Sequence, residues 1–141
     1  MHYKIHAIDV KNALKNYIWL LEDTTTQEVV VIDPTDADLV TAFCEQHQLE
    51  LKQIWLTHWH RDHTDGVQGL LAEQNLPVFG PRDELSKISF ISNPLQHNDH
   101  FHFNDLKVEI IATPGHTLGH IVYFIEEIDT LFSGDTLFAM G

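Results

Sequence analysis

The stretch THWHRDHTDG, residues 57 to 66, places three histidines and two aspartates within ten positions. It follows LKQIWLT, residues 51 to 57, whose apolar and β-branched residues predict a strand. On a strand, positions 58, 60 and 62 would share a face while 63 pointed away, and on a helix 58 and 60 would diverge by about 200 degrees. Neither regular element gathers these side chains, so the sequence predicts a loop here, between a strand and a helix.

The residues concerned are His58, His60, Asp62 and His63. Imidazole and carboxylate together suit zinc or a similar first-row metal, and catalytic sites keep one coordination position open for water. A loop can divide the four between two neighbouring ions, with the first two residues facing one ion and the last two facing the other. Four ligands are too few for two ions, so further ligands are expected elsewhere in the chain.

Further candidates lie in PGHTLGH, residues 114 to 120, and in SGDT, residues 133 to 136. His116 and Asp135 each stand where a predicted strand gives way to a loop, beside a glycine that allows close approach of the backbone. The chain contains 11 histidines, so most of them are expected to be ordinary surface or core residues. We assign that role to the histidines outside the motifs, namely His2, His6, His47, His97, His100 and His102.

The remaining sequence predicts an α/β fold. A helix of about twelve residues, with Asp36 as its N-cap, connects two strands that are expected to be neighbours in one sheet. A shorter helix over residues 66–74 follows the histidine-rich loop. Strands are expected at residues 2–10, 16–23, 27–33, 51–57, 101–103, 106–114, 120–127 and 130–135.

Charge and composition exclude several classes of protein. Eight Lys and Arg against 21 Asp and Glu give a net charge of -13, which repels phosphate backbones and anionic lipid surfaces. We therefore expect no nucleic-acid partner and no membrane partner. The opening MHYKIHAIDV lacks the apolar core of a signal peptide, and no apolar run approaches the roughly 20 residues that a membrane helix requires. The sequence predicts a cytoplasmic chain.

Length and cysteine content predict one domain over residues 1–141 without a disulfide. A chain of 141 residues, 43% hydrophobic, is long enough for one packed core. Cys44 is the single cysteine, which excludes an intrachain disulfide and a cysteine cluster for zinc. Because Val40, Phe43 and Cys44 recur at helical spacing, we expect this thiol to be buried and structural.

These motifs together resemble a known family. THWHRDH is similar to the T-H-x-H-x-D-H signature of the metallo-β-lactamase fold superfamily, and PGHT and SGDT stand in the order of its later ligands. Within it, KNYIWLLED, VIDP, PGHTLGH and FSGDTLF resemble the glyoxalase II (hydroxyacylglutathione hydrolase) family over essentially the whole chain. The resemblance implies an αββα sandwich, mainly its N-terminal half. The family's last metal ligand and its C-terminal helical region have no counterpart, so we expect a truncated chain.

The resemblance also implies a set of metal ligands. It predicts two divalent ions, zinc with iron or manganese as alternatives, and it gives Asp62 and Asp135 a catalytic role. The first ion would be held by His58, His60 and His116, the second by Asp62 and His63, and Asp135 would bridge the two.

Several neighbouring residues receive roles from the same comparison. Asp33 would orient a ligand histidine by hydrogen bonding, although an aspartate before a proline is also a common turn residue. His120 is not a ligand in the family, and we expect it to be structural. Trp59 is a wall of the site or a packing residue. Gly66 follows an aspartate where the family often has a second glycine, which leaves the path of the loop open.

The implied activity is hydrolysis of S-D-lactoylglutathione to D-lactate and glutathione through a metal-bridging hydroxide, a step of methylglyoxal detoxification. Other enzymes of the superfamily are alternatives, such as a persulfide dioxygenase, a lactonase or a β-lactamase-like hydrolase. A further alternative is an inactive metal-binding domain. An exposed sheet edge would allow such a chain to self-associate.

Overall fold

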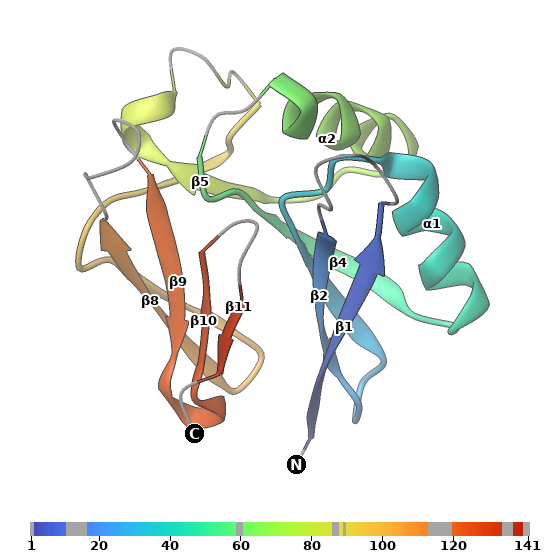
Figure 1. Ribbon diagram of the computed structural model, residues 1–141, viewed down its shortest axis with the longest axis horizontal. Helices are drawn as coiled ribbons and strands as arrows, with labels where there is room; N and C mark the ends of the chain where they lie inside the picture. The colour runs from blue at the N-terminus through green and yellow to red at the C-terminus, as the bar shows by residue number, and fades with distance from the viewer. Residues whose placement is uncertain are drawn as a thin grey trace.

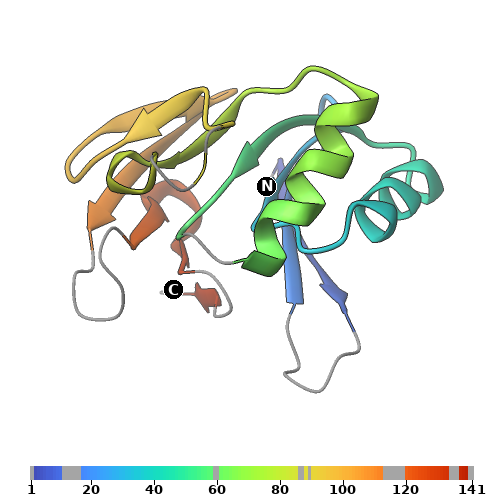
Figure 2. The same cartoon turned by 90° about the horizontal axis from the view of Figure 1, so that it is seen from above.

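Two β-sheets lie face to face, and two α-helices cover the outer face of one of them (Figure 1). The computed structural model describes residues 2–10, 17–58, 61–85, 88, 90–112, 120–133 and 137–139, with side chains throughout except at 61–65 and 137–139. Figure 2 shows α1 (Ala37–Gln46) and α2 (Arg61–Glu73) together on one side of the first sheet, with the second sheet on its other side.

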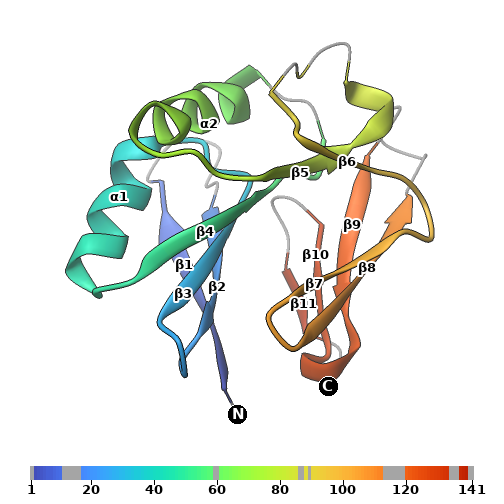
Figure 3. The ribbon, with the colours of Figure 1, turned by 180° about the vertical axis from the view of Figure 1, so that it is seen from behind.

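The first sheet, sheet A, is mixed. Its strands in spatial order are β1 (Tyr3–Asp9), β2 (Tyr17–Asp23), β3 (Glu28–Ile32), β4 (Glu50–Trp55), β5 (Val78–Pro81) and β6 (Asn93–Leu95). β1, β2 and β3 pair antiparallel, whereas β3, β4, β5 and β6 run parallel (Figure 3). The expected pairing of the strands before and after α1 is therefore confirmed. The parallel arrangement brings the C-terminal ends of β3 and β4 to the same edge.

The second sheet, sheet B, is antiparallel throughout. Its strands in spatial order are β11 (Leu137–Ala139), β10 (Thr130–Phe132), β9 (Ile121–Ile125), β8 (Leu106–Ala112) and β7 (His100–Phe103). Short 3-10 turns, η1 (Arg82–Glu84) and η2 (Glu126–Ile128), follow β5 and β9. Four of these strands match the sequence prediction, whereas β11 and, in sheet A, β5 and β6 were not predicted. Each of these three strands has only three or four residues and carries no clear periodic pattern.

The centre of sheet A is buried on both faces. β3 carries an unbroken apolar run, residues 29 to 32, in which every residue is fully buried. Val29 and Val31 belong to the core between sheet A and the helices, and Val30 and Ile32 to the core between the two sheets. Because strand side chains alternate between faces, such a run requires cover on both sides. Sheet A is thus the middle of three layers.

The start of α1 agrees with the sequence prediction, whereas the start of α2 does not. The Asp36 carboxylate accepts a hydrogen bond from the Leu39 amide at 3.1 Å, so the predicted N-cap of α1 is confirmed. α2 begins at Arg61, five residues before the predicted start, and the expectation of a loop over that segment was wrong. The first turn of α2 is polar and lacks apolar spacing, but an acidic residue there is favoured by the helix dipole.

Among the described residues, no helix is both long and apolar enough to cross a membrane.

Candidate metal centre

The candidate site begins at the edge where β3 and β4 end. Asp33 follows β3, and Thr57 and His58 follow β4. The Asp33 amide donates to the carbonyl of Trp55 at 2.9 Å, which continues the pairing of the two strands to their ends. Asp33 has a φ of 49°, a left-handed conformation that aspartate tolerates better than most residues. This turn directs the chain from β3 toward α1 and leaves the carboxylate beside the end of β4.

Asp33 holds Thr57 through both of its carboxylate oxygens. Oδ1 accepts from the Thr57 amide at 2.9 Å, and Oδ2 accepts from the Thr57 hydroxyl at 2.6 Å. Both residues are buried, with 3% and 0% of their surface exposed. A buried carboxylate is costly unless it is hydrogen-bonded, so these two donors account for the placement of a charged group at this position.

Thr57 in turn contacts His58, with Oγ1 lying 2.8 Å from Nδ1. The Thr57 hydroxyl has one hydrogen, which it donates to Asp33. Oγ1 can therefore only accept from the imidazole, so Nδ1 carries the ring hydrogen. In a neutral imidazole the lone pair then lies on Nε2, the form that a metal ion requires. The chemistry of this arrangement fits a metal ligand at His58.

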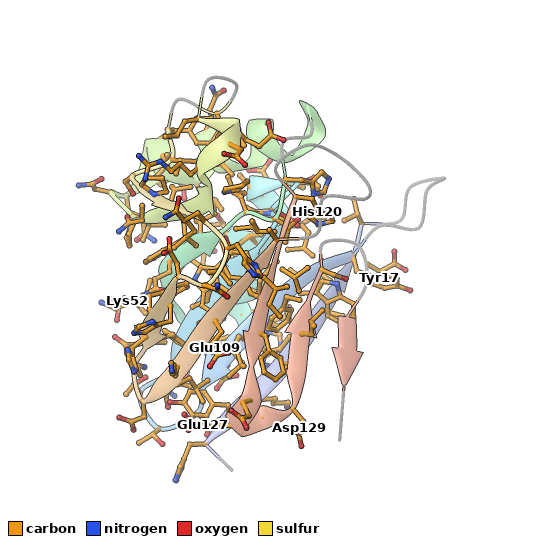
Figure 4. All side chains as sticks on the ribbon, turned by 90° about the vertical axis from the view of Figure 1, so that its left-hand side faces the viewer. Tyr17, Lys52, Glu109, His120, Glu127 and Asp129 are labelled. Atoms are coloured by element: carbon orange, nitrogen blue, oxygen red, sulfur yellow. The ribbon has the colours of Figure 1, made fainter. Side chains whose placement is uncertain are left out.

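His120 lies beside His58. The two ring centroids are 5.0 Å apart with an interplanar angle of 49°. His120 immediately precedes β9, and the amide of the next residue, Ile121, donates to the Thr57 carbonyl at 2.8 Å. Figure 4 shows His120 at one end of sheet B, with Glu127 and Asp129 at the other end. The start of β9 is thus bonded directly to the segment that carries His58.

The flanks of the later motifs reach the same end of sheet B. Ala112, the last residue of β8, pairs with Ile121, and Phe132, the last residue of β10, pairs with Tyr123. The segment that contains PGHT joins β8 to β9, and SGDT follows β10. Both motifs therefore follow the ends of described strands, and the pairing with β9 places these two ends near one another.

The remaining predicted ligands are only partly placed. Asp62 and His63 lie in the first turn of α2 rather than in a loop. His60, His116 and Asp135 lie outside the described residues, as does Trp59. Within the described part of the chain, no group of three or more His, Cys, Asp or Glu side chains is arranged to hold a metal ion. The ligand set therefore stays a prediction.

Comparison with known proteins places the chain in a family. Residues 12–141 match the model of the metallo-beta-lactamase superfamily. The chain belongs to this superfamily. The family predicted from the motifs is thus confirmed.

Two curated relatives of this chain are named hydroxyacylglutathione hydrolase. A hydroxyacylglutathione hydrolase from Marinomonas sp. is 42% identical over 127 residues, which cover 89% of this chain and 48% of the relative. Another from Shewanella oneidensis is 41% identical over 145 residues, which cover 97% of this chain and 53% of the relative. The chain spans about half the length of the curated relatives it matches.

Solved structures show the same fold. The BLEG-1 B3 metallo-β-lactamase has a TM-score of 0.81 at 23% identity. The match covers 96% of this chain and 73% of the BLEG-1 chain. ETHE1 from Myxococcus xanthus has a TM-score of 0.75 at 24% identity, covering 92% and 56%. The chain therefore has the metallo-β-lactamase fold and represents the N-terminal half of it, as the sequence predicted.

Gly66 explains how α2, in this superfamily member, approaches the turn after β3. A Cβ at this position would lie 2.8 Å from the carbonyl carbons of Pro34 and Thr35 and would overlap the Pro34 oxygen. Only glycine allows this contact between two backbones. Gly66 thus fixes the second turn of α2 against the turn after Asp33, and the segment whose path the sequence left open is the beginning of a helix.

Two residues that sequence reasoning did not single out complete the described part of the site. Thr57 was read only as part of the motif, and its link between Asp33 and His58 depends on a contact across 24 positions. Tyr123, in the middle of β9, donates its hydroxyl to the Leu56 carbonyl at 2.6 Å. Neither contact has a signal in local periodicity, because both depend on tertiary pairing.

Two pockets lie outside the hydrogen-bonded core of the site. A pocket of about 240 Å³ is lined in part by Arg82, His97 and His120, so it adjoins the candidate centre. A pocket of about 370 Å³ lies between the C-terminal halves of α1 and α2 and includes Cys44 and Leu51. It is at the opposite end of β4 from His58, so it does not belong to the candidate centre. Cys44 is 8% exposed, and its predicted burial is confirmed.

Proposed function

We propose that this chain is the metal-binding part of a hydrolase of glutathione thioesters, which converts S-D-lactoylglutathione to D-lactate and glutathione. The observation that carries the proposal is the chain of hydrogen bonds from Asp33 through Thr57 to His58, which leaves Nε2 of His58 as the ligand nitrogen. It occurs in a superfamily member whose curated relatives are named hydroxyacylglutathione hydrolase.

The proposed metal site follows the ligand pattern predicted from the motifs. We assign two divalent ions, with zinc as the first choice and iron or manganese as alternatives. His58, His60 and His116 would hold one ion, Asp62 and His63 the other, and Asp135 would bridge them. Imidazole and carboxylate donors are the set that zinc takes in hydrolases.

The chain's own residues prepare this site for chemistry. Divalent ions bound there would acidify water and polarise the thioester carbonyl. Asp33 and Thr57 fix the tautomer of His58 and keep its ring oriented. The packing of α2 against the turn after β3, through Gly66, fixes the helix whose first turn contains Asp62 and His63.

Location, domain extent and association are part of the proposal. We treat residues 1–141 as one metallo-β-lactamase-like domain that acts in the cytoplasm on a small-molecule thioester, as a step in methylglyoxal detoxification. Self-association would use a sheet edge such as β7, the last strand of sheet B, whose His100 and His102 are exposed. Sedimentation at several protein concentrations tests this self-association.

The experiment that tests the function measures hydrolysis of S-D-lactoylglutathione by zinc-loaded protein, with the metal content of each sample determined in parallel. Wild type is compared with His58→Ala and with His102→Ala, a matched control that removes an exposed histidine from β7. We expect His58→Ala to lose at least about 100-fold in turnover together with bound zinc. His102→Ala should match wild type in both.

The outcomes separate the proposal from its rivals. Equal turnover in wild type and His58→Ala would contradict a role for this site. Zinc binding that depends on His58, without turnover, would support the second candidate, a metal-binding domain without activity of its own. That candidate is kept because the chain spans about half the length of its relatives. Oxygen consumption with a persulfide substrate, or selective iron binding, would favour a persulfide dioxygenase.

A further inference from the structure

Tyr123 occupies the layer between the two sheets. It is fully buried, and its ring stacks on Trp55 of β4 with centroids 5.1 Å apart and an interplanar angle of 9°. Trp55 is the last residue of β4, so this stack brings the middle of β9 against the point where β4 gives way to the His58 segment. The ring alone would account for Tyr123 as an ordinary core residue.

The hydroxyl of Tyr123 makes polar contacts that the ring alone would not make. It donates to the Leu56 carbonyl at 2.6 Å and lies 3.3 Å from the Phe79 carbonyl. Leu56 is the residue between the end of β4 and Thr57, and its amide donates to the same Phe79 carbonyl at 2.8 Å. The Tyr123 hydroxyl therefore joins sheet B to two neighbouring strands of sheet A, at the residue that follows β4 and at Phe79 within β5.

A second bond from β9 acts on the next peptide group. The Ile121 amide donates to the Thr57 carbonyl at 2.8 Å. The carbonyls of Leu56 and Thr57, the two residues directly before His58, are thus both held by β9. Asp33 holds the amide and hydroxyl of Thr57 from the other side, from sheet A. The segment before His58 is fixed from both sheets.

We infer that Tyr123 is a positioning residue for the metal centre, whose hydroxyl fixes the backbone that places His58. This inference rests on the proposed metal site at His58 and adds a residue that lies on sheet B, away from the ligand motifs. Burial, together with the nearby Asp33 carboxylate, raises the pKa of Tyr123 well above its usual value, so the hydroxyl keeps its hydrogen.

The test compares zinc affinity in Tyr123→Phe with wild type, by competition against a chromophoric chelator. Phenylalanine keeps the ring and the stack on Trp55 but cannot donate to Leu56. Thr130→Val is the matched control, because it also removes one buried hydroxyl from sheet B, which donates to the Ile128 carbonyl at 2.8 Å at the far end of β10. Urea unfolding of both variants measures the general cost of losing a buried hydrogen bond.

We expect Tyr123→Phe to bind zinc about tenfold more weakly than wild type, the lower end of the effect of groups that orient a ligand. Thr130→Val should stay within about twofold of wild type even where its loss of stability is similar. A cobalt-substituted sample gives a second readout, since its visible spectrum should change in Tyr123→Phe and not in Thr130→Val.

Two results would overturn the inference. One is zinc affinity in Tyr123→Phe within twofold of wild type, and the other is an equal loss in Thr130→Val. If Tyr123→Phe does not fold, 4-aminophenylalanine at position 123 supplies a ring donor, and a folded protein without wild-type zinc affinity would overturn the inference as well. Failure of the proposed metal site is distinguishable, because wild type would then bind zinc no more tightly than His58→Ala. Absence of turnover alone would contradict the proposed hydrolase activity and would leave the comparison of zinc affinity between Tyr123→Phe and wild type intact.

Discussion

Asp33 and Thr57 are joined by two hydrogen bonds across the ends of neighbouring parallel strands, one to the amide at 2.9 Å and one to the hydroxyl at 2.6 Å. The pair is buried, so water does not compete for these bonds. Because the Thr57 hydroxyl donates its hydrogen to Asp33, its oxygen can only accept a hydrogen bond from Nδ1 of His58. A carboxylate on one strand thereby sets the tautomer of a histidine that follows the next strand.

Asp33→Asn should weaken zinc binding by about 10- to 100-fold while leaving the shape of the site almost unchanged. An amide has one acceptor oxygen, which can still receive the Thr57 amide, and its nitrogen then donates to the Thr57 hydroxyl. Thr57 would in turn donate to Nδ1 of His58, which moves the ring hydrogen to Nε2 and removes the ligand lone pair. Competition with a chelator measures the loss.

Asp99→Asn is the control for this substitution, since the Asp99 carboxylate also caps a backbone amide, that of Gln96 at 2.9 Å, in a turn before sheet B. Its zinc affinity should equal that of wild type. Equal affinity in Asp33→Asn and Asp99→Asn would mean that the hydrogen bonds of Asp33 serve folding alone.

Much of sheet A and α1 could be predicted because local sequence carries the information. The apolar run from Val29 to Ile32 requires a strand covered on both faces, and both cores are present. Asp36 stands before a periodic apolar pattern and caps α1 as expected. These features depend on residues a few positions apart, which is the range over which periodicity and capping act.

The contacts that position His58 could not be predicted in the same way. Tyr123 and Leu56 are 67 positions apart, and Asp33 and Thr57 are 24 apart. A tyrosine in an apolar strand is usual for any core, so nothing in β9 indicated a hydroxyl aimed at the end of β4. The motif predicted His58 as a ligand, whereas its support comes from tertiary contacts that only the fold establishes.

Gly66→Ala should lower the free energy of unfolding by about 2 kcal/mol or more. At an exposed position within a helix the same change is expected to stabilise by up to about 1 kcal/mol, so here the sign is reversed by the overlap with Pro34. Gly69→Ala is the comparison, because its Cβ would lie 2.7 Å from the Ala37 side chain rather than against backbone. Urea denaturation should rank Gly66→Ala as the more damaging, and the opposite order would contradict the account.

Asp36→Ala should destabilise the protein by about 1 kcal/mol through loss of the α1 cap. The Asp36 carboxylate accepts from the Leu39 amide, which has no partner within a helix at that position. Asp38→Ala removes an acidic residue from the same first turn without touching the cap, and it should cost only a few tenths of that. Equal effects of the two substitutions in thermal unfolding would indicate a general charge effect in place of capping.

Cys44 should react slowly with alkylating reagents in the folded protein and rapidly after unfolding. Burial, with a smaller contribution from Glu45, raises the pKa of the thiol from 9.0 to about 11, and the side chain is 8% exposed. At pH 8 about one thiol in a thousand would be ionised in the folded chain, against about one in eleven for an unperturbed cysteine. Mass spectrometry of iodoacetamide-treated protein, with and without urea, measures the two rates on the single cysteine.

The same pKa shift predicts how stability depends on pH. The Cys44 thiol holds its proton more tightly in the folded state than in the unfolded state. Its contribution to the free energy of unfolding is therefore fully present below about pH 9 and is lost as the pH rises toward 11. The difference in unfolding free energy between wild type and Cys44→Ala should therefore be constant up to about pH 9 and then decrease by about 2 kcal/mol. A difference that stays constant to pH 11 would show that the folded thiol ionises as readily as the unfolded one. Because Cys44 lies at the opposite end of β4 from His58, zinc loading should leave the thiol's reactivity in the folded protein unchanged.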